Sequence, residues 1–333
     1  MQMRSIDIHA HIAPAAAAHL AEGETWNGFT RQEMNGRNFL VQGSKRQWLH
    51  PAYSLTADER VAYMDSVGVD VHVLTTWVGL YNYDLPADVG AAAARDCNDY
   101  VAELTRSHPE RFVGMATLPM QDVDAAIAEL DRTVNQLRLK GAQISDHVNN
   151  KTLDHEDFIP FWAAAEKLGA LIFFHQEGDD TIVAPRDTKG YFIDNSIGNL
   201  ADRAVTFATL VFGGVLDRFP DLKVCLAHGG GFACFGAGRM DRGWQVRSEA
   251  RALGAGIPST YLNRVYYDCL THSEAVLRYM IDCAGIDRIF LGSDYPYDMG
   301  IDSPVEWVNS LESLSQDEKD AILWKNLERV LGI

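Results

Sequence analysis

The chain has 333 residues, of which 47% are hydrophobic and 23% charged, and its formal net charge at pH 7 is −17. The composition is that of a globular protein, and the acidity argues against nucleic acids and anionic membrane surfaces as partners. No apolar run is long enough to span a membrane, and nothing resembles a secretion signal. We therefore expect a cytoplasmic protein with free thiols at its five cysteines, Cys97, Cys225, Cys234, Cys269 and Cys283.

The first clear pattern is Ile6-Asp7-Ile8-His9-Ala10-His11, a short apolar strand that ends in two histidines. Side chains two residues apart in an extended chain point to the same side, so His9 and His11 can present two nitrogens to one metal ion. The alternative is one histidine packed in the core and one solvated, and so short a motif alone favours that alternative. Residues 12–56 have weak periodicity, and we expect an inserted lid or subdomain there because long irregular segments in compact domains are commonly functional.

From Thr56 onward the pattern alternates between helices and strands. Helical spacing predicts helices over 57–66, 87–108, 123–137, 158–168, 200–218, 232–247 and 273–284, and a helical tail from 304. Apolar and β-branched runs predict strands over 69–75, 112–118, 139–145, 170–175, 222–228, 264–269 and 288–294.

With the strand that carries His9, these segments make eight alternating β/α units. Such a pattern predicts an α/β fold in one domain over 1–333, a (β/α)8 TIM barrel with a long insertion after strand 1. A doubly wound open sheet is the alternative, and it would need a glycine-rich turn where His9-Ala10-His11 stands.

Polar residues recur at the carboxyl ends of the predicted strands, which is the edge of a barrel where active sites lie. His175 follows the fifth strand, His228 the sixth and Asp294 the eighth. Each has an ordinary structural explanation on its own; Asp294, for example, could cap a helix. Together with His9 and His11, they predict a site for one divalent metal ion.

Four stretches resemble the metal-dependent amidohydrolase superfamily, and within it the branch typified by aminocarboxymuconate semialdehyde decarboxylase. They are Asp7–His11, Met64–Asp70, Ala227–Gly231 and Leu291–Pro296, and they extend over nearly the full length of the chain. The resemblance implies one divalent metal, zinc with manganese as the alternative, held by His9, His11, His175 and Asp294. It implies that His228 is the acid/base beside the metal and that His228 and Asp294 are the catalytic groups.

The resemblance also implies how a substrate is bound. Arg239 matches an arginine that in those decarboxylases reaches the substrate carboxylate from a neighbouring subunit, which implies a homodimer or a higher homo-oligomer. Arg46, Trp48 and Tyr191 are further substrate-binding candidates. The alternative for the arginines is a solvated surface charge, and for the aromatic residues a place in the core.

The leading hypothesis for function is a metal-dependent, non-oxidative decarboxylase of an aromatic or muconate-type carboxylic acid. The alternative is a hydrolase of an ester, lactone, amide or carbon–carbon bond in a related intermediate of aromatic degradation, since the same ligand set can activate water. The run from His175 to Asp180 is more acidic than the matching run in the decarboxylase, which leaves the substrate open. A third hypothesis, a binding protein with a structural zinc, is disfavoured because structural sites are closed and these residues lie at the mouth of a barrel.

Overall fold

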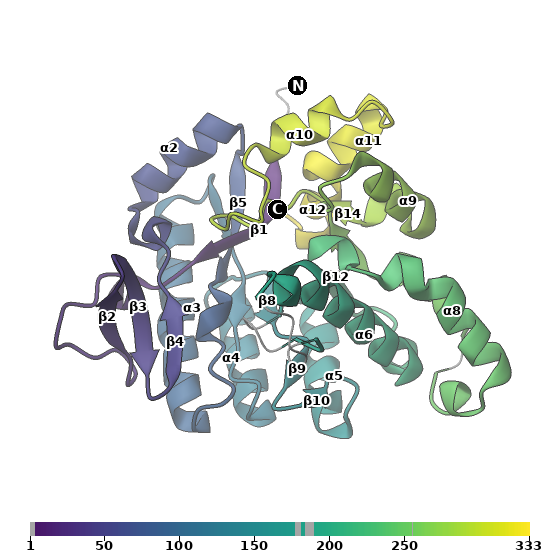
Figure 1. Cartoon of the computed structure of the whole chain (residues 1–333), viewed down its shortest axis with the longest axis horizontal. Helices are drawn as coiled ribbons and strands as arrows, with labels where there is room; N and C mark the ends of the chain where they lie inside the picture. The colour runs from purple at the N-terminus through teal and green to yellow at the C-terminus, as the bar shows by residue number, and fades with distance from the viewer. Residues whose placement is uncertain (1–3, 177–180, 184–189, 255) are drawn as a thin grey trace.

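Parallel strands form the centre of the fold in the computed structural model, which describes residues 4–176, 181–183, 190–254 and 256–333 (Figure 1). One sheet has the order β1 (Ile6–Ile12), β5 (Val71–Thr76), β6 (Phe112–Gly114). The other has the order β14 (Ile289–Phe290), β13 (Tyr266–Asp268), β12 (Lys223–Leu226), β11 (Leu171–Phe174), β8 (Gly141–Ile144), β7 (Ala116–Thr117). These pairings confirm the predicted α/β class.

The two sheets are connected at both of their edges. Strands β6 and β7 are separated only by Met115, so they continue one another along the chain. At the other edge, the amide of Ile8 donates to the carbonyl of Leu291 at 2.9 Å, and the amide of His11 donates to the carbonyl of Tyr295 at 2.7 Å. Strand β1 is therefore hydrogen-bonded to β5 on one side and to the segment that follows β14 on the other.

Helices cover the outside of these strands (Figure 1). The main ones are α2 (Ala57–Val67), α3 (Ala87–Ser107), α4 (Val123–Asn135), α5 (Ile159–Leu168), α6 (Asn199–Phe212), α8 (Ala233–Val246) and α9 (Glu274–Ala284). The tail forms α10 (Pro304–Ser310), α11 (Gln316–Asp320) and α12 (Asn326–Leu331). No helix in the described ranges is long and apolar enough to cross a bilayer.

The prediction of one helix over 200–218 is wrong, because the chain leaves the helix at Gly213 and Gly214. Gly214 has φ 72°, a left-handed conformation that ends α6 and begins the short α7 (Val215–Arg218). Helix α2 follows the prediction closely, since Thr56 and Glu59 form a capping box at its start and Gly68 ends it with φ 76°.

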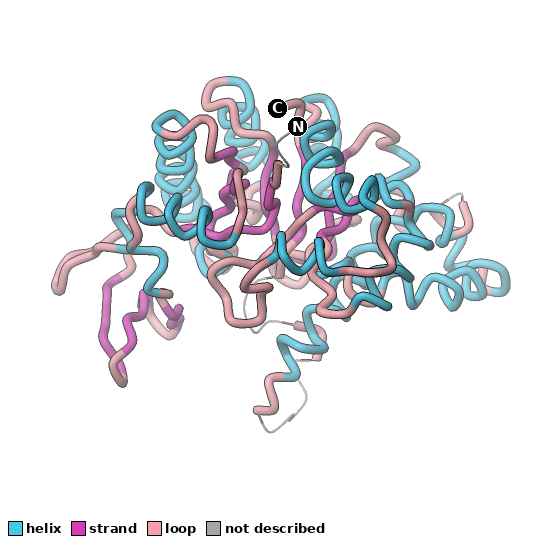
Figure 2. Tube along the Cα trace, turned by 90° about the horizontal axis from the view of Figure 1, so that it is seen from above, coloured by secondary structure: helices cyan, strands magenta, loops and turns pink. Residues whose placement is uncertain are grey.

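The segment 12–56 contains α1 (Ala15–Ala18) and a small antiparallel sheet of β2 (Thr30–Met34), β3 (Arg37–Gln42) and β4 (Lys45–Trp48). Figures 1 and 2 place this sheet at one side of the molecule. Its neighbours Trp26, Phe29 and Leu49 are nevertheless buried in the same apolar cluster as residues of the helices that cover the parallel strands. The extent of a lid over 12–56 stays a prediction.

A buried ion pair fixes α6 to the strands that carry part of the site. Arg203 on α6 is fully buried and forms an ion pair with Asp146, which follows β8. Its guanidinium also donates to the carbonyl of Phe174 at 2.6 Å, and Thr206 donates to the Asp146 carboxylate at 2.5 Å. Because Phe174 directly precedes His175, this pair holds the chain at the end of β11.

We predict that Asp146→Ala lowers the free energy of unfolding by about 3–5 kcal/mol, because it leaves the Arg203 guanidinium buried without a counter-charge. Urea unfolding followed by circular dichroism measures this loss. Asp157→Ala is the matched control: Asp157 pairs with Lys151 at 2.6 Å, but both side chains are about half exposed, so we expect little change. Equal urea midpoints for the two variants would contradict the role given to the buried pair.

Candidate metal centre

Five side chains from four strand ends converge at one edge of the sheet. His9 and His11 lie on β1, His175 follows β11, His228 follows β12, and Asp294 comes after β14. The Oδ1 atom of Asp294 lies 3.1 Å from Nε2 of His9, 3.1 Å from Nε2 of His11 and 3.8 Å from Nε2 of His175. One cation placed beside that oxygen could therefore contact three imidazole nitrogens and a carboxylate.

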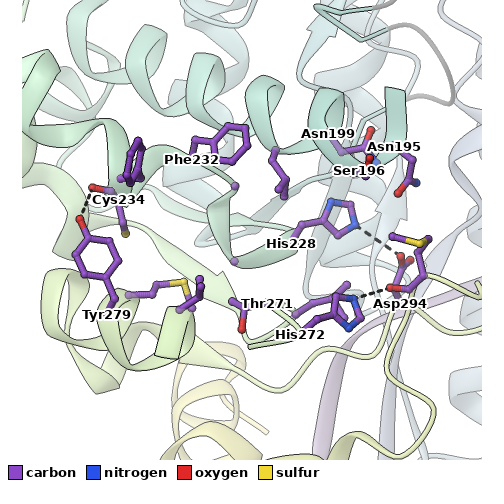
Figure 3. Close-up of a pocket in the computed structure, with 18 residues that line it drawn as sticks. Asn195, Ser196, Asn199, His228, Phe232, Cys234, Thr271, His272, Tyr279 and Asp294 are labelled. Atoms are coloured by element: carbon purple, nitrogen blue, oxygen red, sulfur yellow. Dashed lines mark hydrogen bonds and ion pairs between the residues drawn. The ribbon is translucent and has the colours of Figure 1, made fainter. Parts of the chain in front are cut away.

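His228 approaches the same carboxylate from the other side. Its Nε2 lies 3.6 Å from Oδ2 of Asp294 (Figure 3). Atoms of His9, His175, His228 and Asp294 all lie within 4.8 Å of one another. The structure thus brings together every metal ligand and catalytic residue that the sequence predicted.

The hydrogen bonds of the imidazoles leave the correct nitrogens for a metal. Nδ1 of His9 donates to Asp268 at 2.7 Å, and Nδ1 of His175 donates to the carbonyl of Gln176 at 3.1 Å. Nδ1 of His11 lies 3.1 Å from the hydroxyl of Thr75. With Nδ1 engaged, each ring directs Nε2 inward, and the buried Nε2 atoms of His9 and His175 have no hydrogen-bond partner among the described residues. This donor set fits a divalent ion such as zinc or manganese.

Electrostatics in the site also favour a positive charge beside Asp294. Burial would raise the pKa of Asp294, but the charge of His9 and the neighbouring imidazoles of His11, His175 and His228 hold it well below its usual value. Burial would lower the pKa of His9, but Asp294 and Asp268 outweigh it and raise the value to about 10. Burial lowers the pKa of His11 to about 3 and that of His228 to about 4. Of these imidazoles, His9 is therefore the one whose protonated form Asp294 and Asp268 stabilise most.

His228 and Asp294 both have unusual backbone conformations. His228 has φ 56° and Asp294 has φ 63°, both in the left-handed region that residues other than glycine rarely adopt. Such conformations are enriched at functional sites, where surrounding contacts hold them in place. The glycine at 231 has a packing reason, since a Cβ there would lie 2.1 Å from the carbonyl oxygen of Leu200.

Sequence reasoning missed Asp268, the last residue of β13. Its buried carboxylate accepts from Nδ1 of His9 and from the amides of His228 at 3.1 Å and Gly229 at 2.7 Å. It therefore orients a predicted ligand and the predicted acid/base together. The argument from strand ends would have found it, because the predicted strand over 264–269 ends beside it.

A second carboxylate to which the sequence pattern assigns no role is Asp7, in the first motif. Its carboxylate accepts from the amide of His9 at 2.8 Å and from the amide and hydroxyl of Ser293 at 3.1 and 2.5 Å. Asp7 thus ties the strand of His9 to the segment that carries Asp294.

A cavity of about 680 Å³ opens from His228 and Asp294 (Figure 3). The predicted substrate-binding residues Arg239, Arg46, Trp48 and Tyr191 are not among the described residues of this chain that line it. Arg239 is exposed on α8 and Arg46 is exposed on β4. The ring of Trp48 lies under the guanidinium of Arg37 at 5.1 Å, and Tyr191 is 71% exposed. Their roles stay predictions.

The site and fold define a class of metal-dependent enzymes, and comparison with known proteins gives the family. The amidohydrolase family matches residues 6–333, so the chain belongs to that family. It is 30% identical over 338 residues to a 2-amino-3-carboxymuconate-6-semialdehyde decarboxylase of Dictyostelium discoideum, which covers 98% of this chain and 91% of the relative.

Solved structures of two decarboxylases are similar in fold to this chain over nearly its whole length. A 5-carboxyvanillate decarboxylase from Sphingomonas paucimobilis has a TM-score of 0.82 with 25% identity, covering 100% of both chains. A dihydroxybenzoic acid decarboxylase from Polaromonas sp. JS666, solved with manganese and 2-nitroresorcinol, has a TM-score of 0.80 with 23% identity, covering 99% of this chain and 97% of that one. The second likeness is a likeness of fold.

We predict that Asp268→Asn lowers the affinity for zinc or manganese about 10–100-fold, because a group behind a ligand orients that ligand and raises its basicity. Competition with a chromophoric chelator measures the dissociation constant. Asp282→Asn, an exposed position on α9, is the control and should bind metal like the parent protein. Unchanged affinity in Asp268→Asn would contradict the role of the Asp268–His9 bond.

Proposed function

We propose that this chain is a non-oxidative decarboxylase of an aromatic or muconate-type carboxylic acid. The observation that carries the proposal is the cluster of His9, His11 and His175 around Asp294 at the end of a cavity that His228 also lines. The named activity of the Dictyostelium relative supports decarboxylation over hydrolysis. The strand order supports the further proposal of a closed (β/α)8 barrel with residues 12–56 inserted after its first strand.

We infer that His9, His11, His175 and Asp294 hold a single divalent ion. Zinc suits three imidazoles and one carboxylate, and manganese is the alternative because the Polaromonas structure contains it. When bound, the ion supplies Lewis-acid polarisation of a substrate oxygen. Asp268, Thr75 and the Gln176 carbonyl contact the Nδ1 atoms of the three imidazoles and so keep their Nε2 atoms turned toward the ion site.

The chain's own side chains then supply the proton that the substrate carbon receives. Decarboxylation breaks the bond between the carboxyl carbon and the carbon atom that carries the carboxyl group. The electron pair of that bond stays on this carbon atom. That carbon takes a proton as carbon dioxide leaves, so one solvent proton is consumed in each turnover of the acid anion. Burial keeps the pKa of His228 low, at about 4, so its imidazole is neutral at pH 7. In that state it can accept a proton from a substrate hydroxyl and return it to carbon, while Asp294 stays ionised.

We predict that His228→Ala lowers kcat about 10²–10⁴-fold while metal content stays at the parent level, because general acid–base catalysis contributes about that factor. The assay is carbon dioxide release from a panel of dihydroxybenzoates and muconate-type acids, with zinc or manganese loaded. His155→Ala, at an exposed position, is the control. Oxygen-18 from water in an acid product, without carbon dioxide release, would contradict decarboxylation and favour a hydrolase.

We further propose that the active form is a homodimer or a higher homo-oligomer. Arg239 is exposed on α8, the helix that begins beside the cavity, so in this proposal it reaches the substrate carboxylate of a neighbouring subunit. The remaining substrate-binding candidates are Arg46 and Trp48 on β4, and Tyr191 before the helix that lines the cavity.

The five free cysteines support a reducing, cytoplasmic location for this enzyme.

Mixing inactive subunits tests the shared site. We predict that Arg239→Ala and His228→Ala are each nearly inactive, but that a 1:1 mixture after subunit exchange recovers about a quarter of parental activity, because half the dimers have one intact site. Size-exclusion chromatography with light scattering confirms that both variants assemble. No recovery in a mixture that does form mixed dimers would contradict a site shared between subunits.

A further inference from the structure

Arg60 on α2 is a buried cation that contacts the backbone of a predicted metal ligand. The residue is 4% exposed. Its Nη1 atom donates to the carbonyl of His11 at 3.0 Å, and its Nε atom donates to Nδ1 of His72 on β5 at 3.2 Å. Burying a cation costs free energy, so its presence at this place needs a physical reason.

The same guanidinium contacts the segment that carries Asp294. Its Cζ atom lies 4.9 Å from the centre of the Tyr295 ring, and Tyr295 directly follows Asp294. The carbonyl of Tyr295 accepts from the amide of His11 at 2.7 Å. Arg60 therefore contacts both residues of a backbone link between the two ligand segments.

Through His72, Arg60 also reaches a second link between these segments. Burial lowers the pKa of His72 well below its usual value, so the ring is neutral and its Nδ1 atom accepts from Arg60. The hydrogen of the ring is then on Nε2, which lies 3.7 Å from Oδ2 of Asp7. Asp7 in turn accepts from the amides of His9 at 2.8 Å and Ser293 at 3.1 Å, one in each ligand segment.

Attachment of α2 to the sheet does not by itself account for an arginine at this position. Apolar side chains also attach helices to sheets, and replacing buried charged groups by apolar ones of similar volume is often neutral or stabilising. What a guanidinium adds is direction, because its planar fork donates along fixed lines to more than one acceptor. For Arg60, those acceptors are the carbonyl of His11 and the ring of His72.

We infer that Arg60 is a positioning residue of the metal site, which holds β1 and the segment 293–295 at the spacing that one ion requires. The inference rests on the proposed metal site and goes beyond it, because Arg60 acts through His11, Tyr295 and His72. Its removal should therefore weaken metal binding by more than a general loosening of the fold would.

Arg60→Met tests the inference in the full-length protein, with zinc and cobalt(II) as probes. Methionine keeps a long apolar side chain but removes the charge and both hydrogen bonds. We expect the dissociation constant for each metal, measured by competition with a chromophoric chelator, to rise about tenfold or more, because groups behind metal ligands change affinity by about that factor. We also expect the visible absorption of bound cobalt(II) to shift, since it reports the geometry of the ligands.

Arg111→Met is the matched control. Arg111 also ties α2 to the chain entering β5, because its guanidinium donates to the carbonyl of Asp70 and to the carboxylate of Asp65, both at 2.7 Å. Asp70 directly precedes β5, so this contact lies at the amino end of the strand, whereas the ligands lie at carboxyl ends. We expect Arg111→Met to lower the urea midpoint of the metal-free protein and to leave both dissociation constants and the cobalt spectrum unchanged.

Two variants of His72 test the bridge without removing Arg60. His72→Asn keeps an oxygen near the position of Nδ1, where it can accept from Arg60. His72→Gln places its amide near the position of Nε2 and lacks that acceptor. We expect His72→Gln to weaken metal binding about as much as Arg60→Met does, and His72→Asn to weaken it less.

The outcomes separate this inference from the proposed metal site, and none of the measurements depends on turnover. A parent protein that binds no ion at the cluster would refute the metal site and the inference together. If the parent binds one ion, unchanged affinity and an unchanged cobalt spectrum in Arg60→Met would overturn the inference alone, as would an equal loss of affinity in Arg111→Met. If Arg60→Met does not fold, the two His72 variants decide, and equal metal affinities in them would overturn the inference.

Discussion

The site depends on one constraint, the burial of the Asp294 carboxylate among imidazoles. Asp294 is 5% exposed, and His9 and His11 are fully buried beside it. A buried carboxylate needs a positive partner. Among the described residues around Asp294, that partner is a proton on an imidazole, and a bound cation would take the same place. The arrangement that stabilises His9 as an imidazolium is therefore the same arrangement that prepares a cation site.

Much of the surrounding structure serves to hold these side chains in place. Asp268 orients His9, and Asp7 ties β1 to the segment before Asp294. The buried guanidinium of Arg60 donates to the carbonyl of His11 at 3.0 Å and to Nδ1 of His72 at 3.2 Å. Arg203 does the same for the chain next to His175. Each strand end that supplies a ligand is thus fixed by a buried polar side chain, which keeps the distances in the cluster short.

How far the sequence predicted this arrangement depends on how local each signal is. His9 and His11 are two positions apart on a strand, so their common direction follows from backbone geometry alone. The alternation of strands and helices placed His175, His228 and Asp294 at the same edge, which the structure bears out. Asp268 also lies at the carboxyl end of a strand, but sequence reasoning missed it. No motif of metal-binding or catalytic residues surrounds it in the sequence. Residues 12–56 were the hardest part, since the antiparallel sheet of β2, β3 and β4 depends on packing of Trp26, Phe29 and Leu49 against distant helices. The break at Gly214 likewise depends on one backbone conformation that periodicity does not reveal.

The central claim is that one divalent ion is bound by His9, His11, His175 and Asp294 together. Anomalous X-ray scattering at the zinc and manganese edges, from crystals of protein purified without chelators, tests it most directly. The account predicts a single anomalous peak per chain within bonding distance of the three Nε2 atoms and the Asp294 carboxylate. An empty cluster after addition of either metal, or a peak bound elsewhere, would contradict the account.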